Sequence, residues 1–452
     1  MTFQEAQGYL NSFIDYEKLT DFSYQQSFKV ERIKKLLSIL DNPQEKIKFI
    51  HIAGTKGKGS TCAFIAYILR RAGFKTGLYT SPHLGSFRER IRILSSENNF
   101  EDKDFEGSIS EPDICKYVEK LKIAIEKFIQ QNKNEELSFF EVYTALALLY
   151  FKEKNVDFAV LETGIGGRLD ATNVVDALVC GITPISFEHT QRLGKTLTAI
   201  AKEKAGIIKN KNQIVVSASQ PEEALNVIKE RCKEFDAKLY LLNKDIFFEE
   251  ISSDINGQVF NCFDSFSEYT YLRTGLLGNH QLINAATAIG IVDSLRLHSI
   301  IVSADAIKKG LDDTIWPGRF EIINRNSFVI LDGAQNIASA KELKETINKY
   351  FGSKKVILVL GISQDKDIKG ICKELEPISK TIILTKADHP RALVPEKMKE
   401  FFGKNKEIKM TSSVKEALEL SKSIQEKTDI ILVTGSLFVV GEARNYERTV
   451  KV

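Results

Sequence analysis

Cysteine is scarce in this sequence and is not arranged for cross-linking. The chain of 452 residues has six cysteines, and no two of them form a C-x-x-C pair. A disulfide framework and a structural zinc site are therefore not expected. We expect most of these cysteines to be small buried residues of a protein from a reducing compartment. They are Cys62, Cys115, Cys180, Cys232, Cys262 and Cys372.

Long hydrophobic runs and a charge of one sign are also lacking. No apolar stretch reaches the roughly 18 residues that a transmembrane helix needs. The N-terminal stretch MTFQEAQGYLNSFIDYE has early acidic residues and no apolar region of a secretory signal. The formal net charge is only +3, so no strong field toward nucleic acid or an anionic membrane is expected. We therefore expect a cytoplasmic enzyme without nucleic-acid or membrane partners, and take it to be a monomer.

Apolar stretches typical of buried strands alternate with helical patterns along most of the chain. This alternation predicts an α/β architecture with a largely parallel sheet. The predicted strands are Lys48–Ala53, Thr76–Tyr79, Phe158–Glu162, Ala177–Ile182, Gln213–Ser217, Ser327–Leu331, Val356–Gly361, Thr381–Leu384 and Asp429–Thr434. The predicted helices include Ser60–Arg71, Phe140–Phe151, Gln220–Lys233, His280–Ser294, Ala338–Tyr350 and Val414–Ile424.

The predicted strands form two sets, one ending near residue 217 and one beginning near residue 327. Between them, Asp312–Gly318 (DDTIWPG) contains a proline, a glycine and the only tryptophan, a composition typical of a linker. Residues 236–274 are rich in aromatic and β-branched residues and predict a small antiparallel excursion. The predicted organisation is a domain over 1–312, a linker over 313–318 and a domain over 319–452.

The strongest local signal is the stretch KFIHIAGTKGKGSTCAFIAYILRRAG. The strand Phe49–Ala53 runs into a glycine-rich loop, which an amphipathic helix follows at once. Glycines allow close backbone approach and a helix N-terminus adds positive potential, so this order is typical of a triphosphate site. Lys58 would bridge the β- and γ-phosphates, and Ser60 would hold Mg²⁺. The predicted loop consists of Gly54, Thr55, Lys56, Gly57, Lys58, Gly59 and Ser60.

The alternative for this stretch is a glycine-rich turn that carries two surface lysines. That alternative does not account for a strand, a loop and a helix in the order that a phosphate site needs.

Polar residues follow several other predicted strands, where open α/β sheets place their ligands. Glu162 ends an apolar strand just before a glycine-rich loop, and a carboxylate there suits Mg²⁺, which prefers oxygen ligands. His189 could be a further ligand or a water-mediated partner. Each residue taken alone could equally cap a helix or pair with a neighbour. The clusters are Thr80–Leu84, Leu161–Asn173 and Ser186–His189.

The stretch Leu197–Lys209 (LTAIAKEKAGIIK) predicts a helix with three lysines near its end. From the residues alone, the favoured interpretation is a solvated face with cations that suit a helix C-terminus.

Short motifs along nearly the whole chain resemble those of one family. In order they are GTKGKGST, TSPHL-x-x-FRERI, ETGIGGRLDATN, EHT-x-x-LG, EKAGIIK, GNHQ-x-x-NA, WPGRFE, LDGAQN, PRA and TGSLFVVGEAR. From about residue 30 to residue 444, the chain is thus similar to folylpolyglutamate synthases and bifunctional dihydrofolate synthases, in the Mur ligase superfamily. The resemblance implies an α/β fold with an N-terminal P-loop mononucleotide-binding domain and a smaller C-terminal Rossmann-like domain.

The resemblance also implies a reaction, in which L-glutamate is ligated to a tetrahydrofolate or dihydropteroate carboxylate with ATP and Mg²⁺, through an acyl phosphate. Lys58, His189 and Lys204 match catalytic positions. Lys204 matches a lysine that is carbamylated in the family, and a carbamate presents carboxylate-like oxygens. The positions matched to Mg²⁺ are Ser60, Ser81, Glu162 and His189. The positions that contact ATP from outside the loop are Asn284, Arg319 and Asp332, and those near the acceptor substrate are His83, Phe140, Asp170 and Ala171.

Two positions depart from the family pattern. Lys56 stands where many members have asparagine, and Gln335 stands where many have histidine. Glutamine can donate and accept hydrogen bonds but cannot take a positive charge. A charge-based role at position 335 is therefore in doubt, whereas the nucleotide site is not.

Other functions stay open at this point. A peptidoglycan Mur ligase usually carries an extra N-terminal nucleotide-sugar domain, for which residues 1–47 before the first predicted strand are too few. A P-loop switch or motor ATPase would hydrolyse ATP without a small carboxylate substrate. The stretch Leu169–Asn173 resembles the bifunctional members and predicts both ligase activities, although Ala171 could simply be a small residue in a tight loop.

Overall fold

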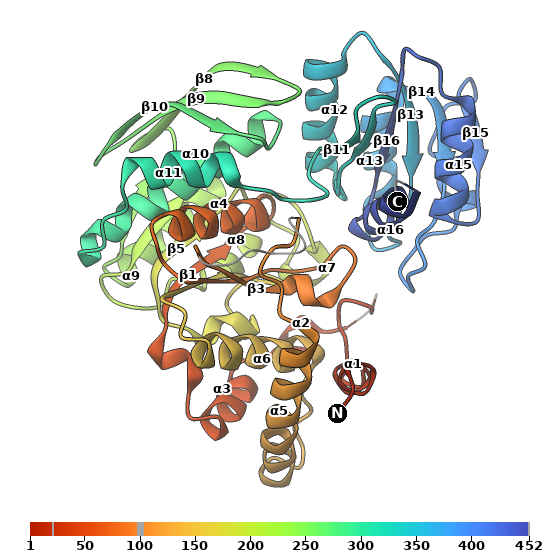
Figure 1. Cartoon of the computed structure of the whole chain (residues 1–452). Coiled ribbons are helices and arrows are strands. Elements are labelled where there is room, and N and C mark those ends of the chain that lie inside the picture. The colour runs from red at the N-terminus through yellow and green to blue at the C-terminus, as the bar shows by residue number, and fades with distance from the viewer. Residues whose placement is uncertain (20–21, 97–103, 451–452) are drawn as a thin grey trace.

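The computed structural model describes residues 1–19, 22–96 and 104–450. Figure 1 shows the C-terminal elements, in blue, beside a larger body that is red to green. Each of the two parts is built around its own mainly parallel sheet. Within the described ranges, no helix combines the length and the apolar character that crossing a bilayer requires.

The larger body contains a seven-stranded sheet in the order β3-β2-β4-β1-β5-β6-β7. Only β2 and β3 pair antiparallel, and the other neighbours are parallel. The inner strands are buried on both faces, which is why they are almost continuous apolar runs. The strands are β1 (Lys48–Ala53), β2 (Thr76–Tyr79), β3 (Ile91–Leu94), β4 (Phe158–Glu162), β5 (Ala177–Ile182), β6 (Ile214–Ser217) and β7 (Lys238–Leu241).

Helices cover both faces of this sheet and form two separate cores with it. One face carries α4 (Lys58–Arg71), α10 (Asn279–Ser294) and α11 (Ala304–Asp313). The other face carries α1 (Phe3–Asn11), α3 (Val30–Ile39), α5 (Glu111–Gln131), α6 (Phe139–Glu153), α8 (Leu197–Ala205) and α9 (Glu222–Glu234). Two short helices, α2 (Tyr24–Ser27) and α7 (Thr190–Leu193), lie in connecting segments.

The predicted antiparallel excursion is a three-stranded sheet that packs on the α10 side of the larger body (Figure 1). It consists of β8 (Ile246–Asp254), β9 (Gly257–Asp264) and β10 (Glu268–Thr274). The predicted range of 236–274 was too wide at its start, because β7 pairs parallel with β6 and belongs to the large sheet. The helix α9 between β6 and β7 makes this crossover possible.

The C-terminal part contains a six-stranded sheet in the order β11-β12-β16-β13-β14-β15, parallel except for the β11–β12 pair. Its strands are β11 (Glu321–Asn324), β12 (Val329–Leu331), β13 (Lys355–Leu360), β14 (Ser379–Leu384), β15 (Glu407–Met410) and β16 (Asp429–Thr434). One face packs against α12 (Ile337–Phe351), α13 (Ile368–Leu375) and α14 (Pro395–Lys399), and the other against α15 (Val414–Ile424) and α16 (Leu437–Val450).

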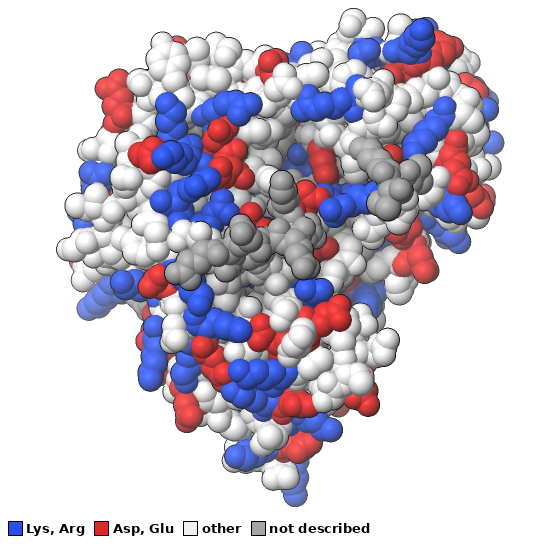
Figure 2. All heavy atoms as spheres, in the orientation of Figure 1, with Lys and Arg blue, Asp and Glu red and all other residues white. Residues whose placement is uncertain are grey.

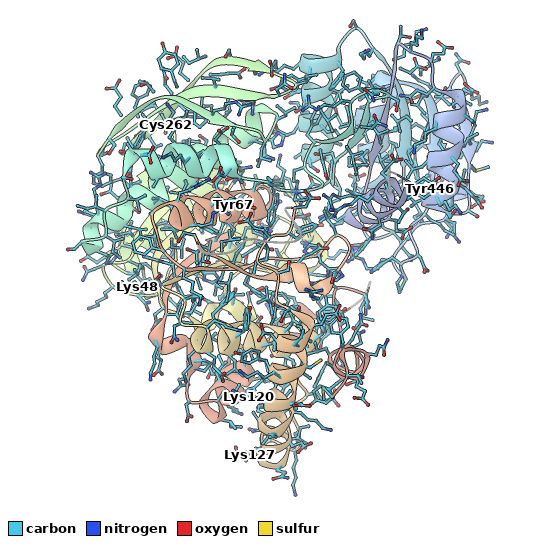
Figure 3. All side chains as sticks on the ribbon, viewed as in Figure 1. Lys48, Tyr67, Lys120, Lys127, Cys262 and Tyr446 are labelled. Atoms are coloured by element: carbon cyan, nitrogen blue, oxygen red, sulfur yellow. The ribbon has the colours of Figure 1, made fainter. Side chains whose placement is uncertain are left out.

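The first helix after the phosphate loop is locked against the last helix of the larger body. Gly310 of α11 meets the backbone of α4, and a Cβ atom added there would lie 2.4 Å from Ile68 Cα. Tyr67 of α4 lies inside the molecule (Figure 3), and its hydroxyl accepts a hydrogen bond of 3.2 Å from the buried Arg92. The helix that begins at the loop is thus held firmly along its length.

This crossing yields a stability prediction. Gly310→Ala should lower the free energy of unfolding by about 1–3 kcal/mol, because the added methyl group overpacks a backbone contact. Gly8→Ala is the matched control, since nothing lies within 4 Å of a Cβ at that helical position. It should raise stability by roughly 0.5–1 kcal/mol through helix propensity alone. Urea unfolding of both variants measures the difference, and equal effects would contradict the interlocked crossing.

Candidate active site

The phosphate loop connects β1 to α4 through two very close backbone approaches. A Cβ at Gly54 (φ +151°) would lie 1.8 Å from Thr183 Oγ1, and one at Gly57 (φ +80°) would lie 2.1 Å from Asn284 Oδ1. Neither position has room for a side chain. Asn284 comes from α10, so the predicted nucleotide-binding asparagine does lie against the loop.

The loop opens into a cleft that both parts of the protein line. Most of the predicted site residues face this cleft, whereas Gly54, His83, Ala171 and Lys204 do not line it. The predicted residues in its lining are Thr55, Lys56, Gly57, Lys58, Gly59, Ser60, Ser81, Phe140, Glu162, Asp170, His189, Asn284, Arg319, Asp332 and Gln335. On the face seen in Figure 2, basic and acidic side chains are interspersed rather than gathered by sign.

Glu162 lies at the end of β4, facing the phosphate loop. Its Oε1 is 3.9 Å from Lys58 Nζ, and its Oε2 accepts a hydrogen bond of 3.2 Å from the Ser81 backbone. Burial raises the pKa of the Glu162 carboxyl, and Lys58 opposes this shift. A buried carboxylate with so few partners would be stabilised by a further cation.

The residues around Glu162 can supply only some of the ligands of a Mg²⁺ ion. In the part of the chain that the structure describes, no three His, Cys, Asp or Glu side chains form a metal-binding group. Glu162, with the hydroxyls of Ser60 and Ser81 on the same cleft, instead supplies a few hard oxygen ligands. Such a set fits Mg²⁺ that takes its remaining ligands from water and phosphate oxygens.

Two further predicted residues lie near the loop, of which Lys204 is buried and His189 is half-buried. Burial lowers the pKa of His189 to about 3, so its imidazole is neutral and can accept a hydrogen bond or bind a metal ion. Lys204 Nζ donates a hydrogen bond to the Gly54 carbonyl, from beneath the loop rather than from the cleft. Burial, with the nearby charge of Lys58, lowers the pKa of Lys204 to about 7.

Arg319 and Asp332 of the C-terminal part line the cleft together with the phosphate loop. The Asp332 carboxylate accepts hydrogen bonds of 2.9 Å from the backbone of Phe320 and of Ala334. It thereby fixes the turn that carries Arg319, whose Nη1 donates to the Gly318 carbonyl at 3.1 Å. Trp316 lies against the loop, because a Cβ at Gly59 would be 3.0 Å from its ring.

The four residues predicted near the acceptor occupy different places. Phe140 lines the cleft, and the glycine loop packs on it, since a Cβ at Gly164 would lie 2.8 Å from its ring. Oδ2 of Asp170 holds that loop, because it accepts hydrogen bonds of 2.9 Å and 3.0 Å from the backbone of Gly164 and Ile165. Ala171 is buried in the next turn, and His83 Nδ1 accepts from Arg90 Nε at 2.9 Å.

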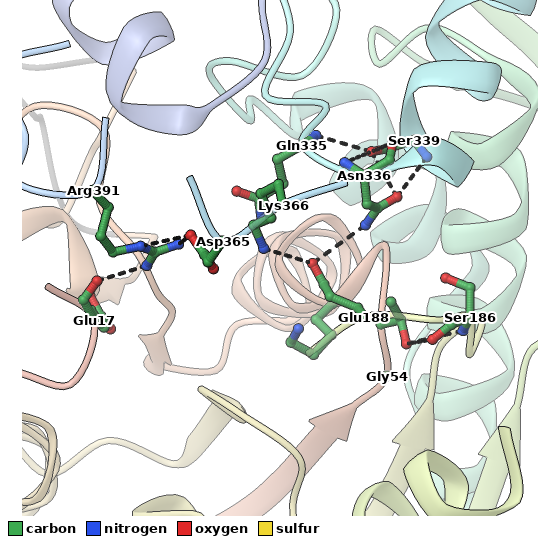
Figure 4. A network of polar contacts seen from close by, with 12 residues as sticks. Glu17, Gly54, Ser186, Glu188, Gln335, Asn336, Ser339, Asp365, Lys366 and Arg391 are labelled. Atoms are coloured by element: carbon green, nitrogen blue, oxygen red, sulfur yellow. Dashed lines mark hydrogen bonds and ion pairs between the residues drawn. The ribbon is translucent and has the colours of Figure 1, made fainter. Parts of the chain in front are cut away.

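A set of charged contacts crosses the cleft, made by residues for which the sequence predicts no role (Figure 4). Glu188 Oε1 lies 3.5 Å from Lys366 Nζ and accepts from Asn336 Nδ2 at 3.4 Å. Burial acts to raise the pKa of Glu188, but Lys366 and then His189 outweigh it and hold that pKa at about 2. Lys366 follows β13 as Glu188 follows β5, so strand ends were the available signal.

Comparison with protein families identifies both parts. Residues 52–292 match the Mur ligase middle domain, and residues 318–437 match the Mur ligase glutamate ligase domain. The middle-domain match alone spans more than half of the chain, so the protein belongs to the Mur ligase superfamily.

Similarity to curated proteins is more specific. The chain is 36% identical over 420 residues to a dihydrofolate synthase/folylpolyglutamate synthase of Bacillus subtilis, covering 91% of this chain and 93% of the relative. It is 32% identical over 447 residues to a folylpolyglutamate synthase of Lacticaseibacillus casei, covering 98% of each. The chain belongs to the folylpolyglutamate synthase/dihydrofolate synthase family.

Solved structures are similar over almost the full length. A Mycobacterium tuberculosis folylpolyglutamate synthase complexed with ADP and AMPPCP has a TM-score of 0.85 at 30% identity, covering 94% of this chain and 96% of that one. A folylpolyglutamate synthase from Thermotoga maritima has a TM-score of 0.83 at 34% identity, covering 100% and 97%. An L. casei enzyme in complex with AMPPCP and folate has a TM-score of 0.83 at 28% identity, covering 99% of each chain.

The environment of Lys204 predicts a covalent modification. With a pKa of about 7, much of the amine is neutral at neutral pH. Its nitrogen can attack CO₂ and lose a proton to form a carbamate. At a fixed CO₂ concentration, carbamate should increase as the pH rises through 7, because only the neutral amine reacts. A ¹³C NMR carbamate signal from labelled bicarbonate measures this.

The control for this experiment lies on the same helix. Lys204→Met should abolish the carbamate signal, whereas Lys202→Met should keep it, because Lys202 is exposed. A signal that survives in Lys204→Met would refute the assignment.

Proposed function

We propose that this protein is an ATP- and Mg²⁺-dependent ligase that joins L-glutamate to the carboxylate of a folate-type acceptor. The single observation that carries the proposal is the facing pair of Lys58 and Glu162, with 3.9 Å between Nζ and Oε1, at the mouth of the phosphate loop. The same cleft is also lined by Arg319 and Asp332 of the C-terminal part. A triphosphate, a metal ion and a second reactant can therefore meet between the two parts.

The proposed reaction has two steps. An oxygen of the acceptor carboxylate attacks the γ-phosphorus of ATP, the bond to the bridging oxygen breaks, and ADP leaves. The amine of glutamate then attacks the carbonyl carbon of the acyl phosphate, loses a proton and expels phosphate. Phosphoryl transfer of this kind depends mainly on positioning and charge stabilisation.

The side chains have distinct parts in this proposal. Lys58 neutralises the phosphoryl oxygens as charge shifts during the transfer. Ser60, Ser81 and Glu162 would hold the Mg²⁺ ion, with His189 beside them. A bound Mg²⁺ ion supplies positive charge at the phosphate oxygens. Carbamylated Lys204 would add oxygen atoms beneath the loop.

The two-part organisation serves to exclude water in this proposal. We propose that residues 1–312 and 319–452 move about the linker 313–318 and close over the acyl phosphate, which water would otherwise hydrolyse. In support, Thr314–Phe320 contains no helix or strand, and it follows α11 directly. We propose that the enzyme acts as a monomer.

We also propose that both family activities are present. The acceptor would lie along Phe140 and the loop that Asp170 holds, where the cleft has apolar as well as polar lining. The phosphate and metal sites are the same for both reactions, so the acceptor pocket decides between dihydropteroate and tetrahydrofolate. The name of the B. subtilis relative, which includes both activities, supports this extension.

The main test separates a ligase from a P-loop ATPase switch. Pure enzyme is offered ATP, L-glutamate and either tetrahydrofolate or dihydropteroate, and the products are identified by mass spectrometry. ATP turnover should depend on the acceptor, and each acceptor should gain glutamate. Lys58→Ala should fold yet lose about 100- to 1000-fold in rate, as expected for one transition-state charge contact.

The outcomes of this test are distinct. ATP hydrolysis that ignores the acceptor would refute the ligase. Extension of tetrahydrofolate without any product from dihydropteroate would leave a folylpolyglutamate synthase alone. Growth rescue of a bacterium that lacks dihydrofolate synthase checks the same point in cells.

Lys56, which stands where many family members have asparagine, has an acidic partner across the cleft. Lys56 Nζ lies 3.7 Å from Glu342 Oε1, and Glu342 belongs to α12 of the C-terminal part. The other oxygen of Glu342 lies 3.8 Å from His280 Nδ1. Burial lowers the pKa of Lys56, and Glu342 opposes the shift. Lys56 can therefore form an ion pair with Glu342 and can also interact with the phosphates of bound ATP.

This competition predicts that substitutions of Glu342 and of Lys56 have opposite effects on ATP binding. Glu342→Gln should tighten binding of an ATP analogue, since it removes a nearby negative charge and frees Lys56. Lys56→Gln should weaken binding, because the charge of Glu342 is then left facing the phosphates. Each change should be about two- to fivefold, the range for partly exposed ion pairs. Calorimetry with the single and double variants measures it, and weaker binding by Glu342→Gln would contradict the argument.

A further inference from the structure

Glu17 is held by both parts of the protein at once. Its carboxylate forms paired bonds with Arg90 of the larger body, with Oε1 2.8 Å from Nη1 and Oε2 2.5 Å from Nη2. Its backbone carbonyl accepts a hydrogen bond of 2.7 Å from Nη1 of Arg391, which belongs to the C-terminal part (Figure 4). Nothing in the sequence around residue 17 indicates that the two parts of the protein meet there.

Arg391 is itself held in place by a second residue. Its Nε and Nη2 donate to Asp365 Oδ1 at 3.0 Å and 2.7 Å, and its side chain is about 10% exposed. The loops that carry the two residues are joined, because the Gln364 backbone donates to the Arg391 carbonyl at 2.9 Å. These loops follow β13 and β14, two neighbouring strands of the C-terminal sheet. The guanidinium therefore moves with that sheet.

The segment that Arg391 reaches is a wall of the cleft. Asp15, Tyr16 and Glu17 line it together with Phe140 and Arg391 itself. Asp15 stiffens the segment, since its Oδ1 accepts from the Glu17 backbone at 3.0 Å. At this point of the wall, the Glu17 side chain is bound to the larger body, and the Glu17 backbone carbonyl is bound to the C-terminal part.

We infer that Arg391 is a positioning residue, which sets the acceptor-side wall 15–17 as the C-terminal part closes. The inference rests on the proposed function, because it assigns this end of the cleft to the folate-type acceptor. The carbonyl of Glu17 is available to the guanidinium only when the two parts are together. Closure thus orders the acceptor pocket and shields the acyl phosphate in one movement. Each guanidinium nitrogen of Arg391 already donates a hydrogen bond, two to Asp365 and one to Glu17, so Arg391 acts through the segment that it holds.

The test compares kinetic constants for each substrate separately. In Arg391→Gln, KM for tetrahydrofolate should rise about tenfold, the size expected for losing a charged hydrogen bond. KM for ATP and for glutamate should stay within about twofold of the unchanged enzyme, because the tie is on the acceptor wall. ATP consumed per amide formed should also rise, since water reaches the acyl phosphate. Arg391→Lys should be intermediate, because lysine can keep one of the two contacts.

A matched control separates this role from general contact between the two parts. Arg444 also reaches across, with Nη2 2.5 Å from Asp104 Oδ2 and Nε 2.9 Å from Glu321 of its own sheet, but it does not line the cleft. Arg444→Gln should leave the acceptor KM and the ATP-to-amide ratio unchanged. Thermal unfolding of each variant checks that it is folded, and Asp365→Asn serves as a second probe of the same tie.

Each outcome decides the inference. An unchanged acceptor KM in both Arg391→Gln and Asp365→Asn overturns it, as does an equal rise in Arg444→Gln. A rise in KM for glutamate instead of the acceptor also overturns it and would place the amine substrate at this wall. Failure of the unchanged enzyme to couple ATP to any acceptor would refute the proposed function itself.

Discussion

Close backbone approach at the phosphate loop is the constraint on which the site depends. Gly54 presses on Thr183 at the end of β5, and Gly57 presses on Asn284 of α10. The loop therefore has a fixed shape before any ligand arrives, set by strands and helices far apart in the sequence. Preorganisation of this kind is what a phosphoryl-transfer site needs, since the charges must already be in place. The positions of Lys58 and Glu162 follow from it.

Much of the fold could be predicted from the sequence, for a physical reason. The strands β1, β2, β4, β5 and β16 begin and end where predicted, because strands buried on both faces are apolar throughout and stop abruptly at polar loops. The strands β3, β11 and β15 were missed, and β7 was assigned to the antiparallel excursion. All four lie at the edges of their sheets, and β7, β11 and β15 are only partly buried, so they lack a continuous apolar pattern. The exact residues of the domain boundary stay a prediction.

The site was predicted unevenly, again for a physical reason. Motifs that follow strand ends predicted the phosphate loop and Glu162, and the resemblance to the family added Asp332. All of them line one cleft, where strand ends of open sheets gather. Strand ends indicate the neighbourhood of Glu188 and Lys366, but the contact between them was not predictable, because neither residue has a local pattern that identifies its partner. The roles of all the predicted site residues stay predictions, and Lys204, Ala171 and His83 do not line the cleft.

The locked crossing of α4 and α11 has a mechanical consequence. The helix α4 starts at the phosphate loop, and α11 ends where the connection to the C-terminal part starts. Arg70 binds Asp313 at that end with a distance of 3.0 Å, and Trp316 rests against Gly59 at the loop. The start of this connection and the phosphate loop are thus held by the same pair of helices. In the proposed closure, the tilt of the C-terminal part would change, whereas the distance from the start of the connection to the phosphate loop would stay constant.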